Sequence, residues 1–439
     1  MPTSRVFVMI KRGKVRPGNS KPFSVPARLF PGLLGGTIGF LAFIAAAQTG
    51  AAKSGTAPGD FETNLPIVFL DATAPITSDP KVPCRLKIIC PRESESGTTS
   101  SLPGTVKFHG ATSQAYPKKS FGLTLDAPNA LLGMRESAHW VLNAAYIDRS
   151  LMRHKISYDL FRSLSTREGK RFAVASRFVE LYLNGNYHGA YLLMERVDRQ
   201  LLELTAYQSN DVSHACIYKA VSHAANFGHP GHAGFEQREP DPLITAHWQP
   251  LDEFTRFVSS TPDAQFFHPS TGIESRLDLD NAIDFHLLVL LTSNMDGITK
   301  NFILARQRPI AGAPGPRFFF APWDYDGTFG RNWDASPVAP SAWLSNHLFD
   351  RLMANPAYRD RFAARWKQLR QHEFSVKTIH SLIDENARTL GAGAQRNAAR
   401  WPVAGGPYPD ALSFADDIAQ MKSWTEARLK WLDQEIQGK

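Results

Sequence analysis

One stretch in the second half of the chain restricts the fold more than any other. An apolar segment, 280–292, precedes the loop Asp-Gly-Ile-Thr-Lys-Asn at 296–301, two short β-favouring runs around a Pro- and Gly-rich turn, and Trp-Asp-Tyr-Asp-Gly-Thr-Phe-Gly at 323–330. The later turns of the apolar segment are hydrophobic nearly all round, which predicts a buried central helix. If the two runs pair as a hairpin, Asp296 and Asp324 come to the same end of one sheet.

The loop and the segment after the hairpin carry the residue types that phosphoryl transfer requires. Such a reaction needs one carboxylate to orient a hydroxyl, and a second carboxylate and an amide oxygen to hold magnesium against the phosphates. We therefore assign Asp296 to the hydroxyl, and Asp324 and Asn301 to the metal. Asp326 is a further candidate for the metal, although an Asp-Gly pair such as the one at 326–327 is equally typical of a turn.

The first half of the chain is mostly β-patterned. Its clearest signal is a hairpin with strands at 177–183 and 186–193, because the Asn-Gly pair at 184–185 supplies the positive φ angles of a type I′ turn. One helix is predicted to begin after Asp148 as its N-cap, with apolar residues at helical spacing up to Leu164. Shorter β-favouring runs occur at 67–70, 85–89, 105–108 and 120–125.

The second half is mainly helical by pattern. Besides the apolar segment, helical spacing and charged surfaces occur at 346–372, 375–400 and 411–436. We therefore predict an α+β protein, with a sheet-rich lobe over 63–200, a mainly helical lobe over 201–439 and a cleft between them.

A Gly-, His- and Pro-rich stretch, 221–242, predicts a long loop. Its histidines at 223, 229 and 232 have a spacing that matches no ligand pair of a helix or a turn, and a metal site needs converging ligands. We interpret these histidines as residues of a solvated loop.

A strand, a turn containing Gly110 and a second strand, 117–125, present two lysines. Lys119 shares a face with the apolar residues of its strand, because side chains alternate with a period of two. A lysine on such a face must find an anion or extend to water, so we interpret it as reaching into the cleft to hold nucleotide phosphates. A strand-end lysine that simply reaches water is the alternative, and Lys118 competes for the same role.

The charge is concentrated at the N-terminus. The chain has 49 Lys and Arg against 41 Asp and Glu, a net charge of +8, and seven of the basic residues but no acidic residue lie in 1–47. The near neutrality of the remainder argues against nucleic acid as a partner. A basic start, an apolar run at 33–47 and small residues at its end are typical of a signal peptide. We predict cleavage near Ala47, a linker at 48–62, and membrane contact only if the segment stays as an uncleaved anchor.

Several segments occur in the order typical of the spore-coat protein H (CotH) family of atypical kinases, which this chain resembles from about residue 65 to about residue 335. They lie at 109–113, 117–121, 140–146, 151–154, 180–195, 296–301 and 322–330. The resemblance implies a secreted, periplasmic or cell-surface protein kinase with a two-lobed protein-kinase-like fold. It also implies the use of ATP with Mg²⁺ or Mn²⁺ to phosphorylate Ser or Thr of a protein substrate.

By position, the resemblance gives roles to single residues. Asp296 resembles the catalytic aspartate, Asn301 and Asp324 the metal ligands, and Lys119 the phosphate-binding lysine. The backbone of Met194-Glu195, which ends the hairpin, resembles a hinge that would contact the purine.

One departure concerns the turn that begins Arg-Gly in the family and His109-Gly110 here. Arginine grips a phosphate with a planar fork, whereas histidine cannot do so bidentately and is mostly neutral near pH 7. Arg149 and Arg153 are the nearby arginines that could replace it.

The sequence leaves other functions open. A non-catalytic surface or coat-assembly protein on a degenerate kinase scaffold accounts for His109. The same cleft could transfer AMP or an amino acid in place of the γ-phosphate. Hydrolysis by carboxylates beside Trp323 and Tyr325, as in glycosidases, leaves Lys119 and Asn301 unused.

Overall fold

The structure is a computed structural model that describes residues 63–91, 98–166, 169–210, 213–309, 312, 315–402 and 412–438. The predicted signal peptide and the predicted linker at 48–62 lie outside the described residues. Among the residues that are described, no helix combines the length and the hydrophobicity that crossing a membrane requires.

Seven strands of the first half form a closed barrel in the order β1-β2-β3-β4-β5-β7-β6. Neighbours in this order are antiparallel except β1 and β6, whose parallel pairing closes the barrel. Alternate apolar residues of the strands fill the interior. The strands are β1 (Ile67–Ala72), β2 (Val82–Ile89), β3 (Leu102–His109), β4 (Ser120–Ala130), β5 (Glu136–Asn143), β6 (Ser176–Leu183) and β7 (Asn186–Glu195).

The hairpin of β6 and β7 confirms the prediction made from its turn. Asn184 and Gly185 have φ values of 48° and 76°, and Leu183 pairs with Asn186 across the turn. Both turn residues are therefore in the left-handed region that a type I′ turn requires.

The helix α1 (Arg153–Ser163) corrects the predicted start after Asp148, because its N-cap is Met152. Leu151 has a φ of 61°, which no residue of a right-handed helix can adopt. Asp148 still serves this end of the helix, since its carboxylate accepts hydrogen bonds from the amides of Ser150 at 3.0 Å and Arg153 at 2.8 Å.

The second half contains a sheet of its own in the order β11-β10-β8-β9. Its strands are β8 (Cys216–Ala220), β9 (Phe235–Glu239), β10 (Phe302–Arg306) and β11 (Phe318–Pro322). The hairpin predicted from the two β-favouring runs is the pair β10 and β11. The long loop predicted over 221–242 is wrong at β9, where Phe235 and Gln237 are buried and the strand pairs with β8.

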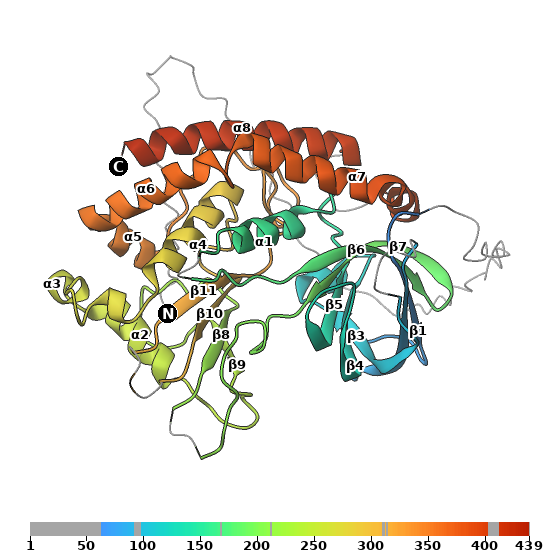
Figure 1. Ribbon diagram of the computed structural model, residues 1–439, viewed down its shortest axis with the longest axis horizontal. Helices are drawn as coiled ribbons and strands as arrows, with labels where there is room; N and C mark the ends of the chain where they lie inside the picture. Colours follow the sequence, from blue (N-terminus) through green and yellow to red (C-terminus); the bar gives the residue numbers. More distant parts are fainter. Residues whose placement is uncertain are drawn as a thin grey trace, which may run out of the picture. The chain divides into compact units, whose positions relative to one another are not determined.

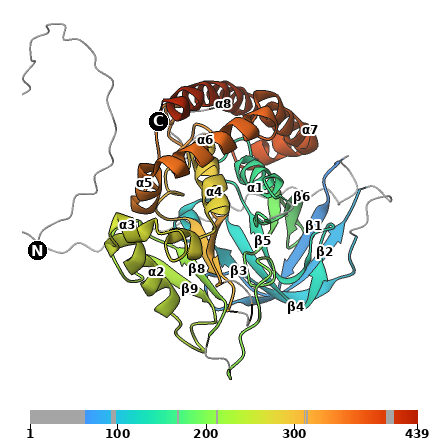
Figure 2. The same cartoon turned by 60° about the vertical axis from the view of Figure 1, so that its left-hand side comes forward.

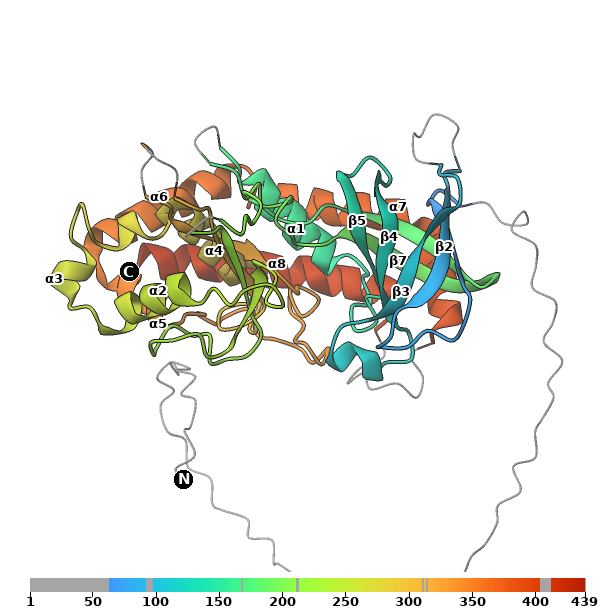
Figure 3. The ribbon, with the colours of Figure 1, turned by 90° about the horizontal axis from the view of Figure 1, so that it is seen from below.

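Seven helices follow in the described part of the second half, and together with the sheets they confirm the mixed α+β class. They are α2 (Gln249–Ser260), α3 (Asp263–Phe266), α4 (Leu279–Thr292), α5 (His347–Ala354), α6 (Pro356–Gln371), α7 (Val376–Arg400) and α8 (Phe414–Gln437). The helix predicted over 346–372 is two helices, because Asn355 caps a new one that has Pro356 in its first turn. Strands β2 to β5 and β7 lie together, apart from α2 to α6 (Figure 3).

The apolar helix α4 is central, as its sequence predicts. All of its residues except Asp280 are buried. It contacts β11, α1, α6 and α8, and it lies between the second sheet and the helices α6 and α8 (Figure 2). The loop that carries Asp296 leaves the end of this helix, so the loop begins from a rigid support.

The long helix α7 joins the second half to the barrel, where it lies beside β6 and β7 (Figure 1). Its Arg396 donates two hydrogen bonds of 2.8 Å to the buried carboxylate of Glu180 on β6. Gly189 on β7 has a φ of +114°, and a Cβ there would lie 2.7 Å from Asn397 Oδ1. This close contact explains why glycine occupies the position.

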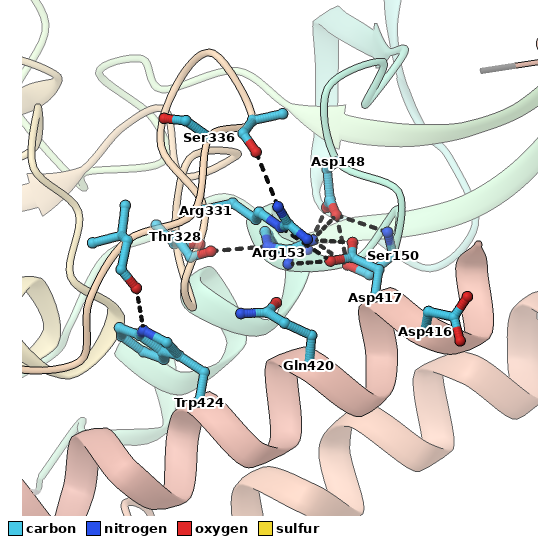
Figure 4. A network of polar contacts seen from close by, with 12 residues as sticks. Asp148, Ser150, Arg153, Thr328, Arg331, Ser336, Asp416, Asp417, Gln420 and Trp424 are labelled. Carbon is cyan, nitrogen blue, oxygen red and sulfur yellow. Dashed lines mark hydrogen bonds and ion pairs between the residues drawn. The ribbon is translucent and has the colours of Figure 1, made fainter. Parts of the chain in front are cut away.

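A buried ionic network ties three distant segments together (Figure 4). The Arg153 guanidinium, which is fully buried, pairs with Asp148 and donates to both oxygens of Asp417 on α8, at 2.6 and 2.9 Å. Its Nε also donates to the carbonyl oxygen of Thr328, at 2.8 Å. The network therefore joins α1 and α8 to the segment that follows the second sheet.

We expect Arg153→Met to destabilise the fold by about 3 to 5 kcal/mol, because it leaves the buried Asp148 without its counter-charge and Asp417 with Arg331 alone, at 3.5 Å. Urea unfolding followed by circular dichroism measures this loss. The matched control is Arg361→Met, because Arg361 also pairs with two acids, Glu274 and Asp280, but all three side chains are exposed. The control should cost less than about 1 kcal/mol. Equal losses in the two variants would contradict the role of the buried network.

Candidate active site

A cleft of about 1030 Å³ opens between the barrel and the second sheet. Strands β3, β4 and β5 contribute one wall, and β8, β9 and the ends of the β10–β11 hairpin contribute the other. The structure brings most of the residues selected from the sequence into this one cleft. They are Gly110, Lys118, Met194, Asp296, Asn301, Asp324 and Asp326.

The β10–β11 hairpin brings Asn301 and Asp324 together at its open end. Phe302 pairs with Pro322, so the residues before β10 and after β11 lie side by side. Asn301 and Asp324 have φ values of 58° and 60°, which cost conformational energy in residues other than glycine. The amide of Asn301 donates to Ala220 O at 2.9 Å, and that of Asp324 donates to the Tyr158 hydroxyl at 3.0 Å. These bonds hold the strained backbone in place.

Two carboxylates and one imidazole meet at this end of the hairpin. Asp324, Asp326 and His154 have polar atoms within 4.8 Å of one another. Burial, together with the negative charges of Asp324 and Asp148, raises the pKa of Asp326 well above its ordinary value. A divalent cation would relieve this repulsion, and carboxylate and amide oxygens are the ligands that Mg²⁺ and Mn²⁺ prefer. The residues present fit such an ion.

His154 faces this group as a hydrogen-bond donor. Its Nδ1 accepts a hydrogen bond from the amide of Tyr325 at 3.0 Å, and burial lowers the pKa of the ring, so the neutral ring carries its proton on Nε2. That buried nitrogen lies 3.8 Å from Asp324 Oδ1 and has no hydrogen-bond partner among the residues that the structure describes. Because this nitrogen carries the proton, Asp324, Asp326 and Asn301 are the residues that would hold a metal. The sequence signal for His154 was only its place in the segment 151–154.

Asp296 has a basic side chain beside each of its oxygens. Lys300 Nζ lies 2.9 Å from Oδ2, and His223 Nε2 lies 3.7 Å from Oδ1. The Asp296 side chain is 18% exposed, and it lines the same cleft as the metal candidates. Its carboxylate is therefore accessible to a hydroxyl that enters the cleft.

The two lysines singled out in the sequence have other partners. Lys118 is buried, and its Nζ donates to Ala144 O at 2.7 Å, to Ala190 O, and to Asn397 Oδ1 on α7 at 2.9 Å. All three of its protons are used within the fold. Lys119 does not line the cleft, and its Nζ donates to Gln114 O and Tyr116 O, each at 2.6 Å. Both ammonium groups are therefore hydrogen-bonded to groups of the protein itself.

Other cationic side chains line the cleft instead, and the sequence analysis did not single them out. They come from segments that are far apart along the chain, namely Lys81, Lys107, Arg196, Lys219, Arg238 and Lys300. Lys219 on β8 packs 4.6 Å from the centre of the Trp323 ring. Burial and the nearby charge of Arg238 lower the pKa of Lys219. β8 and β9 were not predicted, so their side chains could not be assigned to a wall.

His109 lies among these cations. Burial, together with the charges of Arg196, Lys219, Lys107 and Arg238, lowers the pKa of His109 to about 4. The ring is therefore neutral at pH 7. Neither Arg149 nor Arg153 lines the cleft, and Arg153 is committed to its buried network. The arginines that do line the cleft are Arg196 and Arg238.

Of the two residues predicted as a hinge, Met194 and Glu195, one lines the cleft. Met194 lines the cleft, but the amide of Glu195 donates to Ala175 O at 3.1 Å. The Glu195 carboxylate accepts from the amides of Ala175 and Arg135, at 2.7 and 3.3 Å. Val197, two residues further on, lines the cleft. The purine contact of Met194-Glu195 stays a prediction.

The chain belongs to the CotH family, since residues 106–432 match the family model described as CotH kinase protein. This match confirms the resemblance carried by the ordered motifs. The chain is also 28% identical, over 291 residues, to the inner spore coat protein H of Bacillus subtilis (strain 168). The similar region covers 63% of this chain and 71% of that protein.

We expect Mn²⁺ to stabilise the protein by about 2.7 kcal/mol when it is present at a hundred times its Kd, because it binds only the folded site. Thermal unfolding with Mn²⁺ and with a chelator measures the effect. Asp326→Asn should abolish most of this stabilisation. Asp334→Asn is the control. Asp334 is an exposed aspartate that accepts hydrogen bonds from the amide and hydroxyl of Ser336 within its own loop. Full stabilisation of the Asp326 variant would rule out this site.

Proposed function

We propose that this protein is an extracytoplasmic, CotH-like protein kinase that transfers the γ-phosphoryl group of ATP to Ser or Thr hydroxyls of surface or secreted proteins. One observation carries the proposal. The hydroxyl-orienting carboxylate Asp296 and the oxygen ligands Asn301, Asp324 and Asp326 line the same cleft as six Lys and Arg residues besides the buried Lys118. Carboxylates for the acceptor and the metal, facing cations for the phosphates, are the parts that phosphoryl transfer needs.

The fold in this proposal is a two-lobed, kinase-like one. The barrel would be the first lobe, over 63–200, and the second sheet with its helices would be the second lobe, over 201–439. The position of the cleft between the barrel and the second sheet supports this division.

The charges in the cleft support a triphosphate as the ligand. Lys219, Arg196 and Arg238 lie close enough to depress one another's pKa or that of His109. Such mutual repulsion is relieved when an anion binds, and arginine forks match phosphate geometry. In this proposal Lys219 takes the role that the sequence assigned to Lys119, and Arg196 and Arg238 replace the missing arginine at 109.

The proposed reaction forms a bond from the acceptor oxygen to the γ-phosphorus and breaks the bond from that phosphorus to the β,γ-bridging oxygen. ADP leaves, and the hydroxyl proton passes to the Asp296 carboxylate. Asp324, Asp326 and Asn301 would hold the metal, which when bound neutralises charge on the phosphates. His154 keeps Asp324 oriented, and Lys300 keeps Asp296 oriented.

The location outside the cytoplasm is also part of the proposal. The basic and apolar N-terminus has the pattern of a signal peptide. The relative from Bacillus subtilis is described as an inner spore coat protein, which supports a place at a surface or coat.

We expect the protein, incubated with Mg²⁺ or Mn²⁺ and Ser/Thr-rich acceptor proteins, to transfer label from γ-labelled ATP but not from α-labelled ATP. Asp296→Asn should lower kcat at least about a hundredfold, because general-base catalysis is lost. Transfer of the α label would instead indicate AMP transfer. Nucleotide-dependent thermal stabilisation without any transfer would favour the non-catalytic scaffold.

Lys219→Met is expected to raise the KM for ATP about tenfold, which corresponds to about 1.4 kcal/mol of lost phosphate binding. Lys119→Met should change that KM by less than about twofold, because Lys119 does not line the cleft and its ammonium group donates to the backbone carbonyl oxygens of Gln114 and Tyr116. The two steady-state titrations with ATP distinguish the lysines. The opposite ranking would restore the role predicted for Lys119.

A further inference from the structure

We propose that His223 is a positioning residue that orients Asp296 and passes the acceptor proton on to solvent. The inference rests on the proposed function, because it concerns the same carboxylate. His223 lies in the segment after β8 that the sequence described as a solvated loop.

The structure holds His223 against the loop that carries Asp296. Its Nε2 lies 3.7 Å from Asp296 Oδ1, and its Nδ1 lies 2.7 Å from Thr299 Oγ1. The amide of Asn301 donates to Ala220 O at 2.9 Å, which attaches the start of the His223 segment to the same loop. Val221, two residues before His223, lines the cleft. The imidazole therefore lies against the Asp296 loop through one hydrogen bond, to Thr299, and one 3.7 Å approach, to Asp296.

The contact with Thr299 determines what His223 can do. When the neutral ring donates its Nδ1 proton to the Thr299 hydroxyl, Nε2 keeps a lone pair directed at Asp296. Such a nitrogen can accept a proton from the carboxyl group. Lys300, on the other oxygen, cannot, because an ammonium group already carries all its protons.

The proposed step is balanced in protons. After the acceptor oxygen has bonded to phosphorus, Asp296 holds the proton. The two side chains approach from 3.7 Å to hydrogen-bond distance, the O–H bond of Asp296 breaks, and an N–H bond forms at His223 Nε2. The imidazole side chain is 54% exposed, so the resulting imidazolium gives a proton to water or buffer. Asp296 is again a carboxylate, and no other reactant is consumed.

A second histidine of the same segment offers a matched control. His232 is 46% exposed, but it pairs with Asp252 at 2.8 Å and stacks on Trp248 with 4.3 Å between ring centres. It does not line the cleft. Its contacts attach the segment to α2, so its removal tests the segment without touching Asp296.

The kinetic test uses the full chain with γ-labelled ATP and an acceptor protein. We expect His223→Ala to lower kcat about tenfold, to leave the KM for ATP unchanged, and to regain activity when free imidazole is added. His232→Ala should show neither the loss nor the rescue. A loss of activity that imidazole does not restore, or an increase in KM alone, would overturn the relay.

A second measurement does not depend on turnover. The ¹⁵N resonances of the His223 ring, assigned by comparison with His223→Gln, report which nitrogen carries the proton. We expect the Nδ1–H form in the wild type and a change of these resonances in Asp296→Asn. A ring protonated mainly on Nε2 alone would overturn the inference even if no phosphate is transferred. Transfer by the wild type together with an unaffected His223→Ala variant would sink this inference and leave the proposed function standing.

Discussion

The buried pairing of Arg153 with Asp148 and Asp417 is the interaction on which the rest of the structure depends. A charge is kept in a protein interior when it is paired or fully hydrogen-bonded, so the three segments that supply these groups must meet at one point. Arg153 is the first residue of α1, Asp417 lies in the first turn of α8, and Arg153 also bonds the carbonyl of Thr328. The same buried ion pairs therefore hold both the packed helices and the segment that carries Asp324 and Asp326.

The helix α1 links this ionic network to the candidate active site. One turn of it carries His154 and Tyr158, which accept the amides of Tyr325 and Asp324. These bonds compensate for the left-handed backbone at Asp324 and determine the tautomer of His154. The carboxylates are thus positioned by a rigid helix, although they lie in a connecting segment. This arrangement is what precise positioning of a metal and an acceptor requires.

Local patterns predicted much of the fold and part of the candidate site. The Asn-Gly turn, the apolar helix α4 and the β10–β11 hairpin follow from short-range rules, and the hairpin brings Asn301 beside Asp324. Lys119 shows where such rules fail. Alternation correctly grouped it with Phe121 and its neighbours, but that face is the barrel interior. Only the closure of the barrel, through the parallel pairing of β1 with β6, determines which face is inside.

The sequence by itself determined that the residues proposed for the acceptor and the metal lie together, because their spacing along one hairpin places them at one edge whatever surrounds it. The tertiary structure decided which cations face them. Lys219, Arg196 and Arg238 come from separate strands and a connection, and they meet His109 only when two sheets are placed across a cleft. Contacts between residues that are distant in the chain depend on how whole elements pack, and a local pattern carries no information on that packing.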